Sequence, residues 1–253
     1  MSTNICADMV RANDPDRYLA TMAAPVIARV GLFALYAFNL EIARAPWASG
    51  EAIIAEMRLQ WWHDAIDDLY AGTIRAHQIL APLAEVIARH DLPQNLFLSM
   101  INARRFDIYR DPHADSTAFD IFINATSGNL MQLAAMALGA SPAALPVISD
   151  FAYGAGVANL LRAVPELQAR GRKPLVLTPD AHARSAVQSL QTARRKRAEV
   201  DTTALGAMLV GWRADATLKT ALKYPAKVGA GLLQESPAQR HASLIWRRLS
   251  GLW

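Results

Sequence analysis

The chain has 253 residues, of which 53% are hydrophobic and 19% charged. This balance excludes a disordered chain, which requires low hydrophobicity and high net charge. The formal net charge of +4 is too small to indicate a nucleic-acid-binding protein, but it suits an anionic substrate or an anionic membrane surface. The single cysteine, Cys6, excludes an internal disulfide, and the polar N-terminus lacks the features of a secretory signal.

The most apolar helix is expected at residues 26–42, where hydrophobic side chains occur on nearly every face. Such a helix lies in the centre of a bundle. Asp14 and Pro15, a typical helix-start pair, precede it. The overlapping apolar stretch 23–39 contains Arg29 and is shorter than the roughly 20 residues that span a bilayer. We therefore expect a buried core helix and no transmembrane span.

Helical spacing of apolar residues also dominates the rest of the chain, and strand-like alternation is almost absent. Further helices are expected at residues 51–70, 79–90, 94–109, 118–138, 143–162, 182–198, 205–222 and 237–249. Residues 1–13 are expected to fray, and residues 237–253 to contain a C-terminal helix. No internal repeat and no Gly/Ser-rich or proline-rich linker divides the sequence. The pattern predicts an all-α fold with a single domain over residues 1–253.

Three separated stretches carry the most specific pattern. They read ALYAFNLEIARAPW at 34–47, RLQWWHDAIDDLY at 58–70, and GAGVANLLRAVPE at 154–166, which is followed by GRKPLVLTP at 171–179. In this order they resemble the squalene/phytoene synthase family. The first and third resemble its two aspartate-rich helices, and the second its arginine–leucine–tryptophan helix. The resemblance, over about residues 18–198, implies a helical bundle of the isoprenoid synthase type.

The resemblance also implies a role for the two aspartate-rich helices. In active members, carboxylates one helical turn apart bind Mg²⁺, which bridges them to the substrate diphosphate. At the matching positions this chain has Ala43, Arg44 and Trp47 in the first helix, and Ala163 and Leu167 in the second. Glu166 is the carboxylate left in the second helix. We therefore expect no metal, no other cofactor and no catalysis of the usual magnesium-dependent kind.

Polar and basic residues around the third stretch are the candidate ligand-binding groups. In the family, basic groups at the second aspartate-rich helix and the following loop contact the diphosphate, and arginine has the fork geometry that this anion needs. The diphosphate-site remnant is expected to comprise Arg58, Asn159, Arg162, Glu166, Arg172 and Lys173. The expected cavity-lining residues are Tyr36, Phe38, Glu41 and Trp61. Two alternatives stay open: the cations pair with Glu41, Glu56 or Glu166, and Tyr36 and Phe38 are core residues.

Two acidic runs suggest an alternative, an active prenyl transferase with relocated magnesium ligands. Asp64, Asp67 and Asp68 occur at helical spacing, and Asp107 and Asp111 are one turn apart. Either run would provide oxygen ligands for Mg²⁺. We favour a solvated acidic helix face for the first run and surface ion pairs with neighbouring arginines for the second.

A degenerate branch of the family shares three shorter patterns with this chain. They are AFNLEIA at 37–43, RLQWW at 58–62 and LRA at 161–163. This branch includes assembly factors of respiratory complex I. The likeness implies a non-catalytic scaffold, or an isoprenoid- or lipid-phosphate-binding protein, with respiratory-complex subunits as partners and no nucleic acid.

The C-terminal segment mixes tryptophan with arginine, as at Trp246, Arg247 and Arg248. This composition suits an interfacial membrane contact. It equally suits a last helix that docks on the bundle, which we favour. The expected location is the cytoplasm or a compartment equivalent to the mitochondrial matrix, with peripheral contact at the inner membrane.

Overall fold

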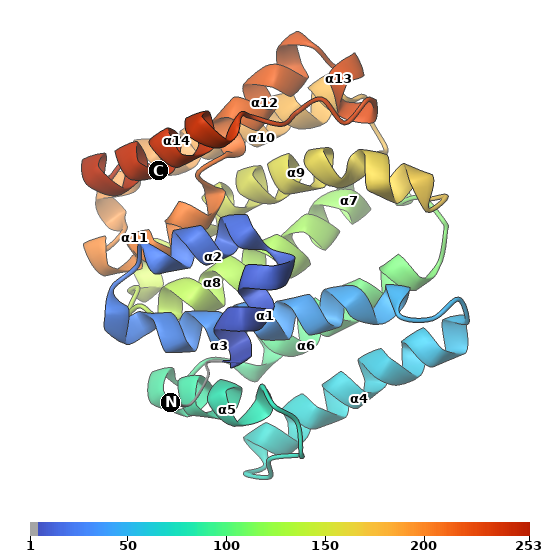
Figure 1. Ribbon diagram of the computed structural model, residues 1–253, viewed down its shortest axis with the longest axis vertical. Coiled ribbons are helices and arrows are strands. Elements are labelled where there is room, and N and C mark those ends of the chain that lie inside the picture. Colours follow the sequence, from blue (N-terminus) through green and yellow to red (C-terminus); the bar gives the residue numbers. More distant parts are fainter. Residues whose placement is uncertain (1–4) are drawn as a thin grey trace.

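Every regular element of residues 5–253, the part of the chain that the computed structural model describes, is a helix (Figure 1). The α-helices are α1 (Ile5–Asn13), α2 (Pro15–Met22), α3 (Val26–Arg44), α4 (Ala52–Tyr70), α5 (Leu80–His90), α6 (Gln94–Arg105), α7 (Ser116–Ile123), α8 (Asn129–Met136), α9 (Leu145–Ala169), α10 (Pro179–Arg195), α11 (Leu205–Met208), α12 (Ala214–Lys223), α13 (Ala226–Gly229) and α14 (Pro237–Ser250). The sequence-based prediction of an all-α fold is confirmed.

Helices α3 and α9 lie in the centre of the bundle (Figure 1). Helix α3 packs against α1, α5 and α8, and α9 packs against α8, α10 and α12. Residues 32–38 of α3 are each at most 3% exposed, and residues 151–158 of α9 are all buried. A helix that contacts protein on every side has to be apolar on every side, which explains the pattern in these two segments.

Two helical stretches, Val26–Trp47 and Pro142–Ala169, are long and apolar enough to cross a membrane by length and composition alone. In the bundle, 56% and 61% of their most apolar windows are buried. This burial agrees with the interpretation of the first stretch as a core helix.

Helix α9 approaches its neighbours closely at two glycines. A Cβ atom at Gly154 would lie 2.5 Å from Cγ of Leu190 on α10. A Cβ atom at Gly156 would lie 2.7 Å from Cβ of Ser127, in the π-helical segment η3 (Asn124–Gly128). Non-bonded carbon atoms do not approach this closely, so a side chain at either position would push the helices apart.

The N-terminal segment differs from the prediction that residues 1–13 fray. Residues 5–13 form α1, which packs against α3, while residues 1–4 lie outside the described part. Cys6 and Val10, one turn apart, are 1% and 0% exposed, and burial raises the pKa of Cys6 to about 11. Two buried residues are too few to give a recognisable helical pattern of apolar positions in the sequence. The Asp14–Pro15 pair starts the short helix α2, not the long helix that follows it.

Other predicted helices are divided or extended. The segment 118–138 forms α7, η3 and α8, because a π-helical turn interrupts it. The segment 205–222 is broken by a 3-10 turn at Leu209–Gly211. Helix α9 continues past the predicted end at residue 162 and through Pro165 to Ala169. A proline inside a helix removes one backbone hydrogen bond, and here the helix tolerates that loss.

Candidate functional site

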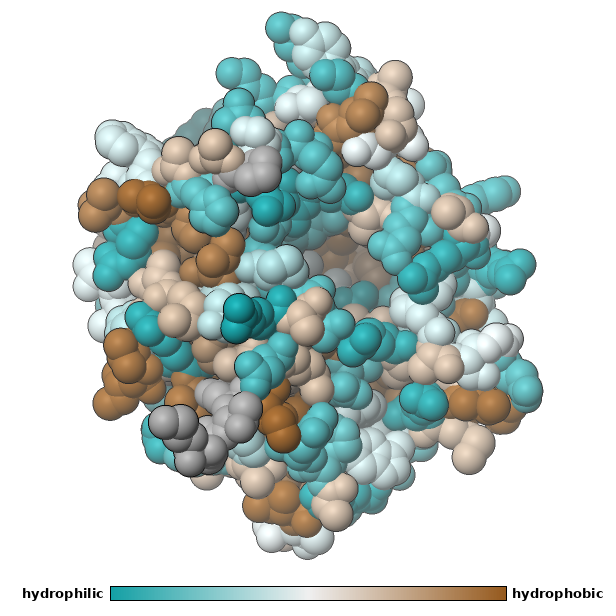
Figure 2. Space-filling view, in the orientation of Figure 1, coloured by the Kyte–Doolittle hydropathy of each residue, from teal (hydrophilic) through white to brown (hydrophobic). Residues whose placement is uncertain are grey.

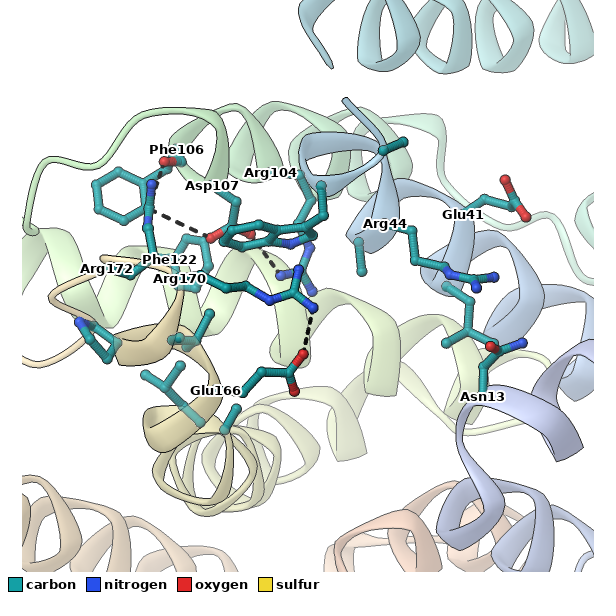
Figure 3. A pocket seen from close by; sticks show the side chains of 18 of the residues that line it. Asn13, Glu41, Arg44, Arg104, Phe106, Asp107, Phe122, Glu166, Arg170 and Arg172 are labelled. Atoms are coloured by element: carbon teal, nitrogen blue, oxygen red, sulfur yellow. Dashed lines mark hydrogen bonds and ion pairs between the residues drawn. The ribbon is translucent and has the colours of Figure 1, made fainter. Parts of the chain in front are cut away.

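A cavity of about 770 Å³ opens between the C-terminal halves of α3 and α9. Helix α4, the end of α6, the 3-10 segment η2 (Phe106–Ile108) and α7 also contribute to its wall. Figure 2 shows the surface hollowed between α3 and α9, and Figure 3 shows the lining side chains. Small-molecule sites in proteins typically have a volume in this range.

The positions at which the family resemblance places aspartates meet in this cavity. All five line it, namely Ala43, Arg44, Trp47, Ala163 and Leu167. The first three come from the end of α3 and the 3-10 segment η1 (Ala45–Trp47), and the other two from α9. Spacings of three and four residues place side chains on the same face of a helix, which brings these positions to one site.

The wall of the cavity is positively charged, because five arginines line it against three carboxylates. The arginines are Arg44, Arg58, Arg104, Arg170 and Arg172, and the carboxylates are Glu41, Asp107 and Glu166. Arg58, Glu166, Arg172 and Glu41 are residues that the sequence analysis had selected. Arg44, Arg104 and Arg170 were not selected as ligand-binding residues, and Asp107 was selected only as a magnesium ligand of the alternative.

Two of the three carboxylates are held in ion pairs (Figure 3). Asp107 lies 3.1 Å from Nη1 of Arg104 and 3.9 Å from Nη2 of Arg172. Glu166 accepts a hydrogen bond of 2.6 Å from Arg170. The pairing of Asp107 with a neighbouring arginine agrees with the sequence-based interpretation, but the Asp107 side chain is only 12% exposed, so this pair is not a surface pair.

Arg172 is buried in the wall, with 6% of its surface exposed. Its Nη2 donates a 2.9 Å hydrogen bond to the carbonyl oxygen of Phe106, and its guanidinium lies 5.2 Å from the Phe106 ring centroid and 6.0 Å from that of Trp47. Its Nη1 is buried without a partner. Burial lowers the pKa of Arg172, and the nearby Asp107 opposes that change. A buried donor without an acceptor costs about 1–3 kcal/mol.

Arg44 and Arg58 differ from the other cavity arginines because both are exposed and unpaired. Within residues 5–253 neither makes a hydrogen bond or an ion pair, and the same holds for the carboxylate of Glu41. In Figure 3 the Arg44 side chain extends freely from α3. The alternative, in which the candidate cations pair with Glu41, Glu56 or Glu166, is not observed in residues 5–253, since Glu56 pairs with Arg105 and Glu166 with Arg170.

His113 is an aromatic part of the wall that the sequence analysis did not select. Its ring stacks on Phe106 with centroids 4.0 Å apart and an interplanar angle of 13°. It also contacts the rings of Phe119 and Phe122. The residue is 7% exposed, and burial lowers its pKa, which favours the neutral imidazole.

Asn159 and Arg162, two of the expected anion-binding residues, lie in a separate polar cluster between α2, α9 and α12. Nη2 of Arg162 donates a 2.9 Å hydrogen bond to Asn159, and Nη1 lies 3.7 Å from Asp16. Arg213 also binds Asp16, and it donates to Glu235 at 3.1 Å. Burial, with Arg213 nearby, lowers the pKa of Arg162 to about 10. These residues are therefore engaged by the protein itself.

The remaining predicted residues are spread over other environments. Lys173 is exposed outside the cavity lining. Phe38 is fully buried between the rings of Trp62 and Phe97, so it is a core residue and not a cavity residue. Tyr36 lines only a core cavity of about 20 Å³, and its burial raises its pKa. Trp61 lines a neighbouring groove.

The acidic run on α4 does not line the cavity. Asp64 accepts a hydrogen bond from Gln60 at 2.7 Å, Asp67 one from Gln94 at 2.7 Å, and Asp68 pairs with Arg75 at 2.5 Å. Asp111 is exposed, also outside the lining. Among residues 5–253, no three His, Cys, Asp or Glu side chains are grouped as a metal site would require.

The arrangement of the helices defines the class of fold. A dehydrosqualene synthase solved in complex with a ligand superposes with a TM-score of 0.78, at 15% identity, over 98% of this chain and 95% of that one. A squalene synthase from Alicyclobacillus acidocaldarius superposes with a TM-score of 0.76, at 16% identity, over 88% and 93% of the two chains. The fold is thus the all-α isoprenoid synthase fold, as predicted.

The sequence model of the squalene/phytoene synthase family matches residues 10–248, and the chain belongs to this family. Complex I assembly factor 6 of Bos taurus is 26% identical over 66% of this chain and 50% of its own length. The Drosophila melanogaster homolog of that factor is 30% identical over 68% and 53%. Phytoene synthase 3 of Zea mays is 26% identical over 66% and 41%. The chain thus spans about half the length of these relatives, or less.

Proposed function

We propose that this protein is a non-catalytic member of its family that binds an isoprenoid or lipid phosphate at the cationic wall of the cavity. The observation that carries the proposal is that Arg44 and Arg58 line the cavity and have no hydrogen-bond or ion-pair partner among residues 5–253. A guanidinium binds a phosphate through two parallel N–H groups, and an unpaired one is ready to do so. The guanidinium of Arg172, which is buried behind the cavity surface, adds positive charge to the same wall.

The residues of the cavity do not fit a magnesium ion. Mg²⁺ requires oxygen ligands in near-octahedral geometry. Asp107 and Glu166 are engaged by arginines, and Arg44 stands where the resemblance places a ligand. An ion bound there would have to displace these pairs and lie among five arginines. We infer that guanidinium groups, and not metal-bridged carboxylates, provide the positive charge at this site.

The active-transferase alternative has less support. Of its candidate ligands, Asp107 lines the cavity but is paired, and the α4 aspartates lie elsewhere. This alternative requires robust magnesium-dependent condensation of farnesyl or geranylgeranyl diphosphate by the purified protein. It also requires that Asp107→Ala abolish that turnover.

The named relatives support a role in the assembly of respiratory complex I. Several of them are assembly factor 6 or its homologs, and the alignments cover up to 68% of this chain. We infer that the protein acts as a scaffold in contact with respiratory-complex subunits. The corresponding location is the mitochondrial matrix or the cytoplasm, peripheral at the inner membrane.

Helix α14 supports the membrane contact. One side of it docks on the bundle: Leu244 is 8% exposed, and Arg248 donates to the carbonyl oxygen of Ala23 at 2.8 Å. On the other side Trp246 and Leu249 are 66% and 78% exposed. Figure 2 shows hydrophobic surface at this end of the molecule. A helix with one apolar exposed face and arginine beside it suits a membrane interface.

Titration calorimetry with inorganic pyrophosphate in EDTA tests the anion-binding proposal. We expect the wild type to bind without a metal, and Arg44→Ala and Arg58→Ala each to weaken binding about tenfold, because a charge-assisted hydrogen bond contributes about 1.5–3 kcal/mol. Lys173→Ala removes an exposed cation outside the lining and is the matched control. Binding that needs Mg²⁺, or equal losses in all three variants, would contradict the proposal.

A further inference from the structure

A second groove, of about 240 Å³, adjoins the cavity on the side of α4. The two hollows share the side chains of Glu41, Arg44, Ala48 and Arg58. The groove is smaller than the range for a whole small-molecule ligand, so it suits part of one. The two unpaired arginines therefore stand at the junction of two compartments.

The compartments differ in chemistry. The larger one carries the buried Arg172 and the ion pairs of Asp107 and Glu166. Beyond the four shared residues, which include the carboxylate of Glu41, the groove is lined by Ala45, Trp61, Trp62 and His77. Trp61 and Trp62 meet edge to face at 4.9 Å, and the His77 ring lies 4.9 Å from that of Trp62. Aromatic rings provide large apolar contact area with fixed geometry.

One stretch of α4 places three groove residues next to one another, namely Arg58, Trp61 and Trp62. Trp61 and Trp62 come three and four residues after Arg58, so they lie next to it on the helix surface. Trp62 is 4% exposed and forms the floor, whereas Trp61 is half-buried and reaches the surface. A molecule held by the Arg58 guanidinium would meet these rings directly.

We propose that the ligand is an anionic amphiphile whose phosphate lies between Arg44 and Arg58, with its apolar chain running along α4 over Trp61. The proposal rests on the anion-binding function proposed above and adds where the chain lies. It assigns Trp61 as a chain-binding residue and the larger cavity as the compartment of the head group.

The bundle core offers the chain little room. The cavity beside Tyr36, between α3 and α9, measures about 20 Å³, which holds about one water molecule. The side chains around it are packed, with Tyr36 2% exposed and Phe38 and Phe151 fully buried. A chain that entered the core would have to displace such residues, whereas the groove over Trp61 is already open.

The groove also discriminates against a cationic group, although aromatic rings bind quaternary ammonium ions. Arg44 and Arg58 line it, and the guanidinium of Arg75 lies 5.9 Å from the Trp61 ring centroid. Arg75 is paired with Asp68, and Glu41 also lines the groove, so the two unpaired arginines leave an excess of one positive charge, which disfavours a choline-like head group. An uncharged apolar chain meets no such opposition.

Three probes test the proposal on the full chain: inorganic pyrophosphate, farnesyl diphosphate and dodecyl phosphate. We expect Trp61→Ala to weaken binding of a chain-bearing probe about tenfold, which corresponds to about 1.4 kcal/mol, and to leave pyrophosphate binding within about twofold. Ile121→Ala, which removes an exposed apolar side chain on α7 outside the lining of both hollows, is the control and should change neither. An isoprenoid and an acyl lipid share this chemistry, and the tighter of the two chain probes identifies the source.

Fluorine NMR of the wild-type protein labelled with 5-fluorotryptophan gives a second readout that does not depend on how Trp61→Ala folds. The Trp61 resonance, assigned with Trp61→Phe, should shift with farnesyl diphosphate or dodecyl phosphate and not with pyrophosphate. If the wild type does not bind pyrophosphate, the proposed function is wrong. If it binds pyrophosphate but Trp61 responds to neither chain probe in either measurement, the function stands and the chain-binding proposal is wrong.

Discussion

Replacing Arg58 with alanine is expected to leave the free energy of unfolding unchanged or to raise it by up to about 0.5 kcal/mol. Arg58 is exposed in the interior of α4 and makes no hydrogen bond or ion pair with the part of the chain that the structure describes. Substitution of such a residue changes stability by no more than about 0.5 kcal/mol. Alanine has the higher helix propensity, and the change removes one of five like charges from the cavity wall.

Arg172→Ala is the contrasting variant, because Arg172 is bound into the same wall. It loses a charge-assisted hydrogen bond to the Phe106 carbonyl, a contribution of about 1.5–3 kcal/mol, and its cation–π contacts with Phe106 and Trp47, about 0.5–1 kcal/mol more. Removal of the buried, unpartnered Nη1 offsets part of this loss, and we expect a net destabilisation of roughly 1–2 kcal/mol.

Urea unfolding followed by circular dichroism measures the free energy of unfolding of both variants. If this free energy depends on urea concentration with the same slope in each, their unfolding midpoints can be compared directly. Thermal shifts with pyrophosphate should shrink in both. A loss above about 1 kcal/mol in Arg58→Ala would show that Arg58 has a structural partner, which would refute the view that it is held free for a ligand. An unchanged stability in Arg172→Ala would refute the reasoning from its burial.

Three further outcomes are expected. Gly156→Ala should destabilise the protein by about 1–3 kcal/mol in urea unfolding, because the added Cβ overlaps Ser127; a normal midpoint would contradict the packing of α9 on η3. Burial lowers the pKa of His113 in the folded protein, so on acidification the imidazole is protonated at a higher pH in the unfolded chain than in the folded one. The free energy of unfolding should therefore fall as the pH drops below about 6.5. His113→Phe keeps the stack on Phe106 and should show a shallower fall of this free energy between about pH 7 and pH 5. The double variant Trp246→Ala, Leu249→Ala should reduce co-sedimentation with anionic phospholipid vesicles several-fold while its melting temperature stays close to that of the wild type, since both side chains are exposed; unchanged co-sedimentation would exclude α14 from a membrane contact.

The helices that sequence analysis predicted best are those whose burial is complete. The segment 26–42 is apolar on all faces, and its residues 32–38 are almost inaccessible. Helix α1 escaped prediction because it buries only Cys6 and Val10 among polar residues. The break at Asn124–Gly128 was also missed, since a π-helical turn leaves the apolar pattern nearly intact.

Sequence analysis could predict a site residue only where its position along one helix determines which part of the protein it contacts. Arg58, Glu166 and Arg172 were selected by motif and line the cavity. Arg162 was selected by the same motif, yet it binds Asp16, because one step along a helix rotates a side chain by about 100°. Arg104 and Asp107 reach the cavity through the packing of α6 against other elements, which no local pattern records.

The polar cluster around Asp16 has a consequence for how the polypeptide reaches its native state. Asp16 on α2 is bound by Arg213, which lies 197 residues further along the chain, and Ala23 accepts a hydrogen bond from Arg248, 225 residues away. Contacts of such long range form late, because the loop between them must first be closed. During synthesis, α2 emerges long before these partners do, and until then its acidic face stays in water. Helix α2 is therefore among the last elements to gain all of its native contacts, although its neighbour α1 can pack on α3 as soon as that helix has formed.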